Sequence, residues 1–200
     1  MDAAGALSMS NSPEVGRERT RLNFPHVVLQ GFAFVSNSGF TQVEALPTIV
    51  RYRKDDIELD VFHGRKSWEI GVEISRSGER FSMSEIIRAS DRGAAESYRN
   101  PTALTIGDVQ SGVEKVARAL QRYGEQALRG DAEFFVELKR QRQAWSDAYS
   151  LDVLAEQIRP RADAAFREGR YREAAELYER ISARLSPAEQ KKLAAAQKRA

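Results

Sequence analysis

Cysteine is absent from the 200-residue chain, and histidine occurs only as His26 and His63. A chain without thiols has no disulfide framework, no thiolate nucleophile and no cysteine-based zinc site. The two histidines are far apart in the sequence, so their spacing predicts no metal centre. The lack of cysteine also fits a reducing compartment, and we therefore expect a cytoplasmic protein.

Long apolar runs are missing as well. The longest, such as Gly31–Val35, are too short to span a bilayer, and Met1–Asn11 has no cationic stretch ahead of an apolar run, so we expect neither a membrane segment nor a secretory signal. The formal net charge is only +2, which gives no overall field for nucleic acid. No glycine-rich phosphate or dinucleotide motif is present, and we expect no cofactor.

Three parts are predicted from the distribution of residue types. Residues 1–21 are rich in small and charged side chains and are expected to be disordered. Residues 22–150 form the expected α+β domain, because they combine strand and helix patterns. Residues 151–200 form a helical appendage.

Period-two alternation between Thr48 and Arg76 is the clearest structural signal. The alternating apolar positions fall in three runs: Val50 and Tyr52; Ile57, Leu59 and Val61; Trp68, Ile70, Val72 and Ile74. Such alternation is typical of half-buried strands. The connections Lys54–Asp56 and His63–Lys66 have hairpin length and composition. The sequence therefore predicts a three-stranded antiparallel meander packed with helices.

Helices are predicted on both sides of this meander. Residues Phe24–Val35, with Pro25 in the first turn and Gly39 at the exit, favour a short helix, although their side chains also suit a strand. Capping patterns open later helices: Ser82 with Glu85, and Thr105 with Asp108. One helix face is expected at Val109, Val113, Val116, Leu120 and Tyr123. A following helix, with a buried stripe of Phe134, Leu138, Trp145 and Tyr149, is expected to break at Pro160.

The C-terminal segment resembles one tetratricopeptide repeat. The matching residues are Ala164, Phe166, Gly169, Tyr171, Ala174, Tyr178 and Pro187. In this interpretation Gly169 permits the turn between two helices and Ala174 lets their backbones approach closely. Because arrays of this kind normally contain about three repeats, we expect a single helical hairpin that packs on the preceding helix.

Stretches in the middle of the chain resemble an uncharacterised group of small bacterial cytosolic proteins, over about residues 30–145. These stretches are Val50–Tyr52, His63–Ile74, Arg122–Gly124 and Arg129–Asp131. The resemblance implies a related fold in a bacterial protein and attaches no activity to it.

The meander face opposite its apolar side carries charged residues of both signs. They are Arg51, Arg53, Glu58, Asp60, Glu69 and Glu73. One interpretation is a solvated face with cross-strand ion pairs. The other is a docking surface for a basic protein partner, which charge would steer.

Enzymatic chemistry finds less support. A strand nuclease would need a Glu-x-Lys, but Gly71 follows Glu69 at that position and Ser75 follows Glu73. His63, expected in a turn with Arg65 and Lys66, suits phosphate binding or proton transfer, yet no nucleophile accompanies it. We therefore expect a protein that is not an enzyme.

Two functional hypotheses follow. The first is a protein-binding module, either an adaptor or an immunity-type protein that neutralises a bacterial toxin. The second is a regulator that contacts RNA or DNA through the arginine-rich C-terminal helices. Glutamates such as Glu168, Glu173 and Glu176 interleave with those arginines. This mixture of signs is more typical of a solvated helix surface than of a surface that binds nucleic acid.

Overall fold

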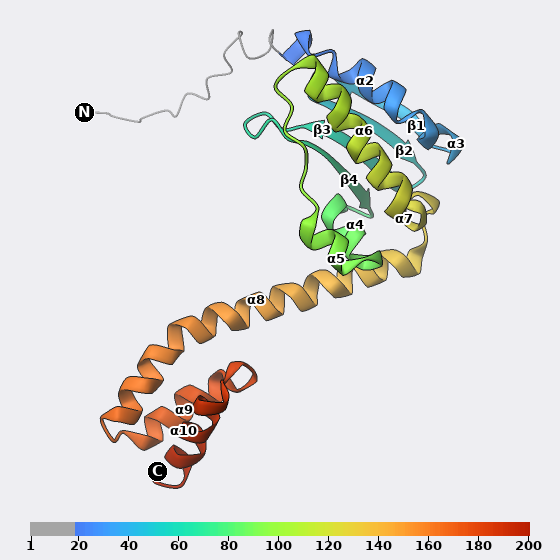
Figure 1. The fold of residues 1–200 in the computed structure, drawn as a ribbon. Helices are drawn as coiled ribbons and strands as arrows, with labels where there is room; N and C mark the ends of the chain where they lie inside the picture. Colours follow the sequence, from blue (N-terminus) through green and yellow to red (C-terminus); the bar gives the residue numbers. More distant parts are fainter. Residues whose placement is uncertain (1–18) are drawn as a thin grey trace, which may run out of the picture. The chain divides into compact units, whose positions relative to one another are not determined.

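The computed structural model describes residues 19–200 (Figure 1). The disorder predicted for residues 1–21 therefore falls largely outside the described residues, and residues 19–21 are helical. The chain divides into two units, the first ending at Lys139 and the second comprising Arg140–Ala200. Each unit has its own cluster of buried apolar side chains.

The first unit contains an antiparallel sheet of five strands in the order β1-β2-β3-β4-β5. Its strands are β1 (Thr41–Leu46), β2 (Ile49–Lys54), β3 (Ile57–His63), β4 (Ile70–Arg76) and β5 (Glu79–Ser82). The α+β class is confirmed, and β2 to β4 correspond to the predicted meander. The prediction of three strands is wrong, because an edge strand lies on each side of them.

Most apolar side chains of the central strands point to one face of the sheet. Val50, Leu59 and Val72 are fully or almost fully buried there. The helices α2 (Phe24–Gly31), α4 (Met83–Ser90) and α6 (Ile106–Tyr123) contact strands of this sheet, and α2 and α6 lie together on one face in Figure 1. This face is called the inner face, and the opposite one the outer face.

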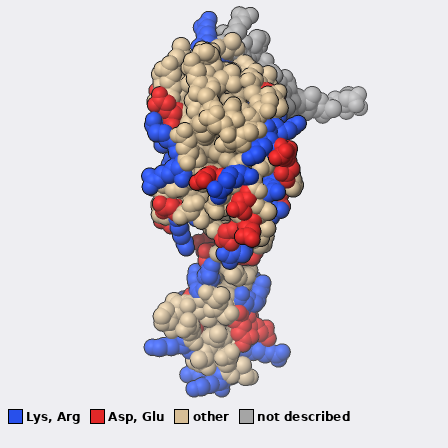
Figure 2. All heavy atoms as spheres, turned by 90° about the vertical axis from the view of Figure 1, so that its right-hand side faces the viewer, with Lys and Arg blue, Asp and Glu red and all other residues tan. Residues whose placement is uncertain are grey.

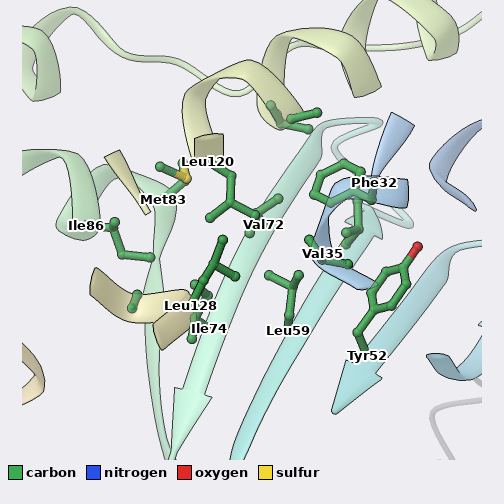
Figure 3. Packing of buried hydrophobic residues seen from close by; sticks show 14 of the residues in the cluster. Phe32, Val35, Tyr52, Leu59, Val72, Ile74, Met83, Ile86, Leu120 and Leu128 are labelled. Atoms are coloured by element: carbon green, nitrogen blue, oxygen red, sulfur yellow. The ribbon is translucent and has the colours of Figure 1, made fainter. Parts of the chain in front are cut away.

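Residues from several helices complete the core on the inner face. Figure 3 shows Leu59, Val72 and Ile74 of the sheet beneath residues of these helices and of α3 (Ala33–Asn37) and α7 (Glu125–Arg129). Those residues are Phe32, which lies between α2 and α3, and Val35, Met83, Ile86, Leu120 and Leu128. The segment Phe24–Val35 is helical, as expected, but Phe32 separates it into α2 and α3.

Both predicted capping boxes are present. The hydroxyl of Ser82 accepts a hydrogen bond from the amide of Glu85, whose carboxylate accepts one from the amide of Ser82 at 2.8 Å. Thr105 and Asp108 make the same exchange at the start of α6. A short helix, α5 (Arg92–Ser97), follows α4, and the side chain of Asp91 caps it. These caps satisfy amide groups that would otherwise lack partners in a first helical turn.

Helix α8 (Ala132–Arg167) begins in the first unit and ends in the second, and Pro160 lies inside it. The predicted break at Pro160 is therefore wrong. A proline costs a helix one backbone hydrogen bond, but the adjoining turns are held by Ile158 and Ala162, which are buried in the second core. None of the helices within residues 19–200 is both long and apolar enough to cross a membrane.

The stripe predicted for this helix is only partly buried. Phe134 and Leu138 pack into the first core. Trp145 and Tyr149 stack on each other at a centroid distance of 6.0 Å, and each is 61% exposed. Their predicted burial is wrong, because helical spacing identifies residues on one face but does not supply an element to cover that face.

The second unit consists of the end of α8, α9 (Tyr171–Arg180), the short 3-10 helix η1 (Ser182–Arg184) and α10 (Pro187–Gln197). Gly169 has φ +77° in the turn between α8 and α9, a conformation that favours glycine. Ala174 and Tyr178 are fully buried, and the Tyr178 hydroxyl donates to the carboxylate of Asp163. Ser186 and Glu189 form a third capping box, which opens α10.

Candidate functional site

The outer face of the sheet carries two rows of charged side chains that run across the strands. The register aligns the first row as Glu44, Arg51, Asp60 and Glu73 on β1 to β4. The second row contains Arg53, Glu58 and Arg80 on β2, β3 and β5. Five of the six residues predicted for this face therefore lie together on it.

Arg51 joins three strands through ion pairs. Its Nε donates to Oδ1 of Asp60 at 2.7 Å, and its Nη2 donates to Oδ2 of the same carboxylate at 3.1 Å. Its Nη1 donates to Glu44 Oε2 at 3.0 Å. The hydrogen bond to Asp60 raises the pKa of the Arg51 guanidinium further above its usual range. Asp60 is only 4% exposed, so this group is a fixed part of the sheet.

The second row is more open to solvent. Arg53 Nη2 donates to Glu58 Oε2 at 2.5 Å, and this hydrogen bond lowers the pKa of the Glu58 carboxyl. Arg80 Nη1 lies 3.5 Å from Glu73 Oε2, which links the second row to the first. Ion pairs at such exposed positions stabilise a fold by only about 0–1 kcal/mol. The side chains of the second row can therefore exchange partners at a much lower cost in free energy than Asp60 can.

Glu69, the sixth residue predicted for this face, lies outside the paired register of the five strands. It precedes β4 and forms an isolated antiparallel bridge with Thr102. The preceding residue, Trp68, has φ +58°, a left-handed backbone conformation. The regular alternation of β4 therefore does not extend back to Trp68, which was predicted in the same run.

An apolar row, which was not predicted from the sequence, lies beside the charged rows. Leu46, Ile49 and Phe62 occupy paired positions on β1, β2 and β3, and Gly71 on β4 follows Phe62 in the register. A Cβ atom at Gly71 would lie 2.3 Å from Cζ of Phe62, so the phenyl ring lies over the glycine. The signal in the sequence was a glycine inside a strand, which often marks such a close approach.

His63 is not in a turn, contrary to the sequence prediction. It ends β3 and is buried, with Nε2 2.9 Å from the carbonyl oxygen of Ala103. The rings of Phe24 and Trp68 lie 5.5 and 5.6 Å from its ring centroid. Burial lowers the pKa of the His63 imidazole, and the charge of Arg19 lowers it further.

Arg19 completes the packing around this histidine. Its guanidinium lies 3.5 Å from the centroid of the Trp68 ring, and its Nη2 donates to the carbonyl oxygens of Gly64 and Arg65 at 2.8 and 2.9 Å. These contacts tie the β3–β4 connection to the start of the described chain. The surroundings of His63 are those of a core side chain, whereas Arg65 and Lys66 are exposed. Among residues 19–200, no group of three or more His, Asp and Glu side chains is placed to hold a metal ion.

The cations of the second unit are largely interleaved with acids. Arg184 pairs with Asp152 and Lys192 with Asp163, each at 2.6 Å. Further pairs join Arg159 to Glu189, Arg170 to Glu168 and Glu173, and Arg172 to Glu176. A surface of mixed sign attracts the phosphate backbone of nucleic acids less than a one-signed surface does.

No protein-family model matches the chain, and neither a curated protein nor a solved structure is significantly similar to it. Its function is therefore inferred from the arrangement of its own residues.

Proposed function

We propose that the chain is a non-enzymatic protein-binding module whose binding surface is the outer face of the sheet. The observation that carries this proposal is the apolar row of Leu46, Ile49 and Phe62 beside rows of ion-paired side chains. Protein interfaces combine an apolar, often aromatic centre with a polar rim in the same way.

The geometry of this face favours binding because its side chains are already held in place. Phe62 is supported by Gly71, and Arg51 is fixed by Asp60 and Glu44. Side chains that are ordered before binding lose less conformational entropy when a partner arrives. Phe62 and Arg51 also belong to residue types that are enriched at interfaces.

The charges indicate what kind of partner fits. The outer face has four carboxylates, on Glu44, Glu58, Asp60 and Glu73, and three guanidiniums, on Arg51, Arg53 and Arg80. Since most of them pair with one another, the remaining field is weak and slightly acidic. A partner with an apolar centre and a few basic residues at its rim would complement this face, with charge setting its orientation.

The second unit supports an adaptor or a toxin-neutralising protein as the form of this module. Its left-handed glycine at Gly169, followed by the buried Ala174 and Tyr178, fits the tetratricopeptide-like interpretation of α8, α9 and α10. Repeats of this kind provide surfaces for other proteins when they are stacked. The second unit therefore adds a candidate contact surface to the sheet.

A nucleic-acid-associated role is the alternative, and the charge of the second unit favours it. Residues 140–200 contain thirteen Lys and Arg against nine Asp and Glu. If this unit binds RNA or DNA, the affinity should fall steeply between low and physiological salt, because binding releases counterions. Binding that does not respond to salt, or no binding at low salt, excludes this alternative.

A capture experiment with matched charge reversals tests the proposed function. The immobilised wild-type chain is incubated with native cytoplasmic extract at low salt. The double variant Glu58→Lys/Glu73→Lys is treated in the same way. The control is Glu114→Lys/Glu125→Lys, which reverses two exposed carboxylates that are paired with Arg118 and Arg129 on α6 and α7. We expect mass spectrometry to find one protein in stoichiometric amount with the wild type and the control but not with the outer-face variant. Equal recovery by all three would contradict a role for these charges.

A further inference from the structure

A long segment of the first unit is almost free of charge. Between Arg21 and Arg51 the 29 residues 22–50 contain a single charged side chain, Glu44, although 30% of the whole chain is charged. The segment forms α2, α3, β1 and the start of β2. Burial does not explain its composition, because 22 of these residues are exposed or half-exposed.

The surface residues of this segment form what is here called the neutral surface. In Figure 2 they belong to the broad area without Lys, Arg, Asp or Glu on the side of the first unit where α2, α3 and β1 lie. Three large apolar side chains are exposed on it: Leu29 by 37%, Val43 by 49% and Leu46 by 47%. Between them lie neutral polar residues such as Gln30, Asn37 and Gln42, all exposed.

Depletion of charge, more than total hydrophobicity, distinguishes the centre of a protein interface from other surface. The same depletion restricts what can cover the neutral surface. A partner with an ordinary charged surface would lose hydration there without gaining opposite charges. The partner must therefore be nearly free of charge over a comparable area.

We propose that the neutral surface is the interface of a two-fold symmetric homodimer. A second copy of the chain presents the same uncharged area, so the chemical match holds by symmetry. Amide side chains such as Gln30, Asn37 and Gln42 both donate and accept hydrogen bonds, so each can pair with an amide of the other copy. Two-fold homodimers are the commonest oligomers of soluble proteins, and their interfaces are the more apolar class.

The extent of the neutral surface agrees with a second copy of the chain as the partner. Its 22 exposed or half-exposed residues match the roughly 20–30 residues that each partner contributes to an interface of standard size. Glu44 is the one charge, and it already pairs with Arg51 of its own chain. It therefore needs no partner from the second copy.

The exposed edge of β1 does not extend the sheet into the second copy. Val43 forms a bulge, because Gln42 is opposite Tyr52 and Glu44 is opposite Arg51, with one residue between Gln42 and Glu44. Bulges interrupt the regular backbone groups that strand addition requires. The two copies should instead pack through side chains of α2, α3 and β1. The neutral surface meets the outer face at Glu44, Leu46 and Ile49, so the dimer borders the binding surface proposed above, and the variants that test the dimer leave these three residues unchanged.

Light scattering coupled to size-exclusion chromatography tests the dimer with the full-length chain. We expect a mass of twice the 22.5 kDa of one chain at micromolar concentration. Leu29→Lys/Val43→Lys should be monomeric, with a dimer dissociation constant raised by about tenfold or more. Leu104→Lys/Ile106→Lys, at apolar residues that are 60% and 51% exposed elsewhere in the first unit, should remain dimeric.

A second pair of variants guards against misfolding. Gln30→Glu/Gln42→Glu adds two charges to the neutral surface without changing side-chain size, and Gln110→Glu/Gln121→Glu does the same at exposed positions of α6. Only the first should dissociate the dimer, with unchanged far-UV circular dichroism for both. A monomeric wild type overturns the proposal. So does a dimer that survives both neutral-surface variants, which would place the interface elsewhere.

Discussion

Arg51 on β2 binds both carboxylate oxygens of Asp60 on β3, at 2.7 and 3.1 Å, while Asp60 is almost completely withdrawn from solvent. A carboxylate in such a position has lost its hydration, and the guanidinium compensates for that loss. The pair therefore supports the outer face of the sheet. Other side chains of that face, such as Glu58 and Phe62, remain available to a partner.

Removal of the Asp60 charge should destabilise the fold much more than removal of an exposed one. Asp60→Asn removes the charge that pairs with Arg51 and replaces one of its two acceptor oxygens with an NH2 donor, and it is expected to lower the free energy of unfolding by about 2–4 kcal/mol. Glu58→Gln, in the exposed pair with Arg53, should cost less than about 1 kcal/mol. Urea denaturation measures both values. Similar small losses for the two variants would show that the Arg51–Asp60 pair has no structural role.

Phe62 and Gly71 should be energetically coupled across β3 and β4. Gly71→Ala places a methyl group where the phenyl ring lies and should cost about 1–3 kcal/mol of stability. In the background of Phe62→Ala the same methyl group meets no ring, so Gly71→Ala should cost much less. A double-mutant cycle by urea denaturation measures this coupling. Strict additivity of the two substitutions would mean that the ring does not rest on the glycine.

The stability of the first unit should decrease in mildly acidic solution because of His63. Burial lowers the pKa of this imidazole below its ordinary value of about 6.5, so the folded chain resists protonation. Above that ordinary value His63 is neutral in both states and its contribution is fully present. As the pH falls from about 6.5 toward the folded pKa, the unfolded chain binds a proton more readily and the free energy of unfolding decreases.

A substitution of His63 separates this effect from other titrations. His63→Gln should flatten the dependence of unfolding free energy on pH over this range. Carboxyl groups with a lowered pKa, such as Glu58, lose their contribution only at more acidic pH. A pH dependence that persists in His63→Gln would assign it to another group.

Pro160 should reduce the stability of the second unit. It lies within α8, where it removes a backbone hydrogen bond, and helix-interior proline costs up to about 3 kcal/mol relative to alanine. We expect Pro160→Ala to raise the free energy of unfolding by about 1–3 kcal/mol. Gln157→Ala, at an exposed position of the same helix, should change it little. Urea titration followed by circular dichroism measures both, and a loss of stability in Pro160→Ala would show that packing in this unit requires the proline.

The central strands and the capped helix starts could be predicted because local chemistry determines them. Alternation of one apolar face identifies β2 to β4, and a side chain that satisfies the first amides of a helix marks where it begins. The edge strands lack such a signal. Every side chain of β1 is exposed or half-exposed, so it shows no apolar alternation, and β5 has only four residues.

The parts that were predicted wrongly depend on what lies next to a residue in space. Trp145 and Tyr149 have the spacing of a buried stripe, but burial requires a second element beside them. Trp68 was predicted in the run that forms β4, but its left-handed backbone, which is uncommon for a residue other than glycine, places it outside the strand. Likewise, alternation in the sequence predicts which charged residues share the outer face. Which of them form ion pairs depends on the strand register, which the sequence does not give.

The apolar centre of the outer face offers the most direct test of the proposed protein-binding function. Three immobilised chains are incubated with the same cytoplasmic extract: the wild type, Phe62→Lys and the control Leu104→Lys. The proteins that each chain binds are quantified by mass spectrometry. The proposal predicts one protein that the wild type and Leu104→Lys retain in stoichiometric amount and that Phe62→Lys loses, with thermal unfolding curves showing that all three are folded. Retention of the same proteins by folded Phe62→Lys would contradict a binding surface on the outer face of the sheet.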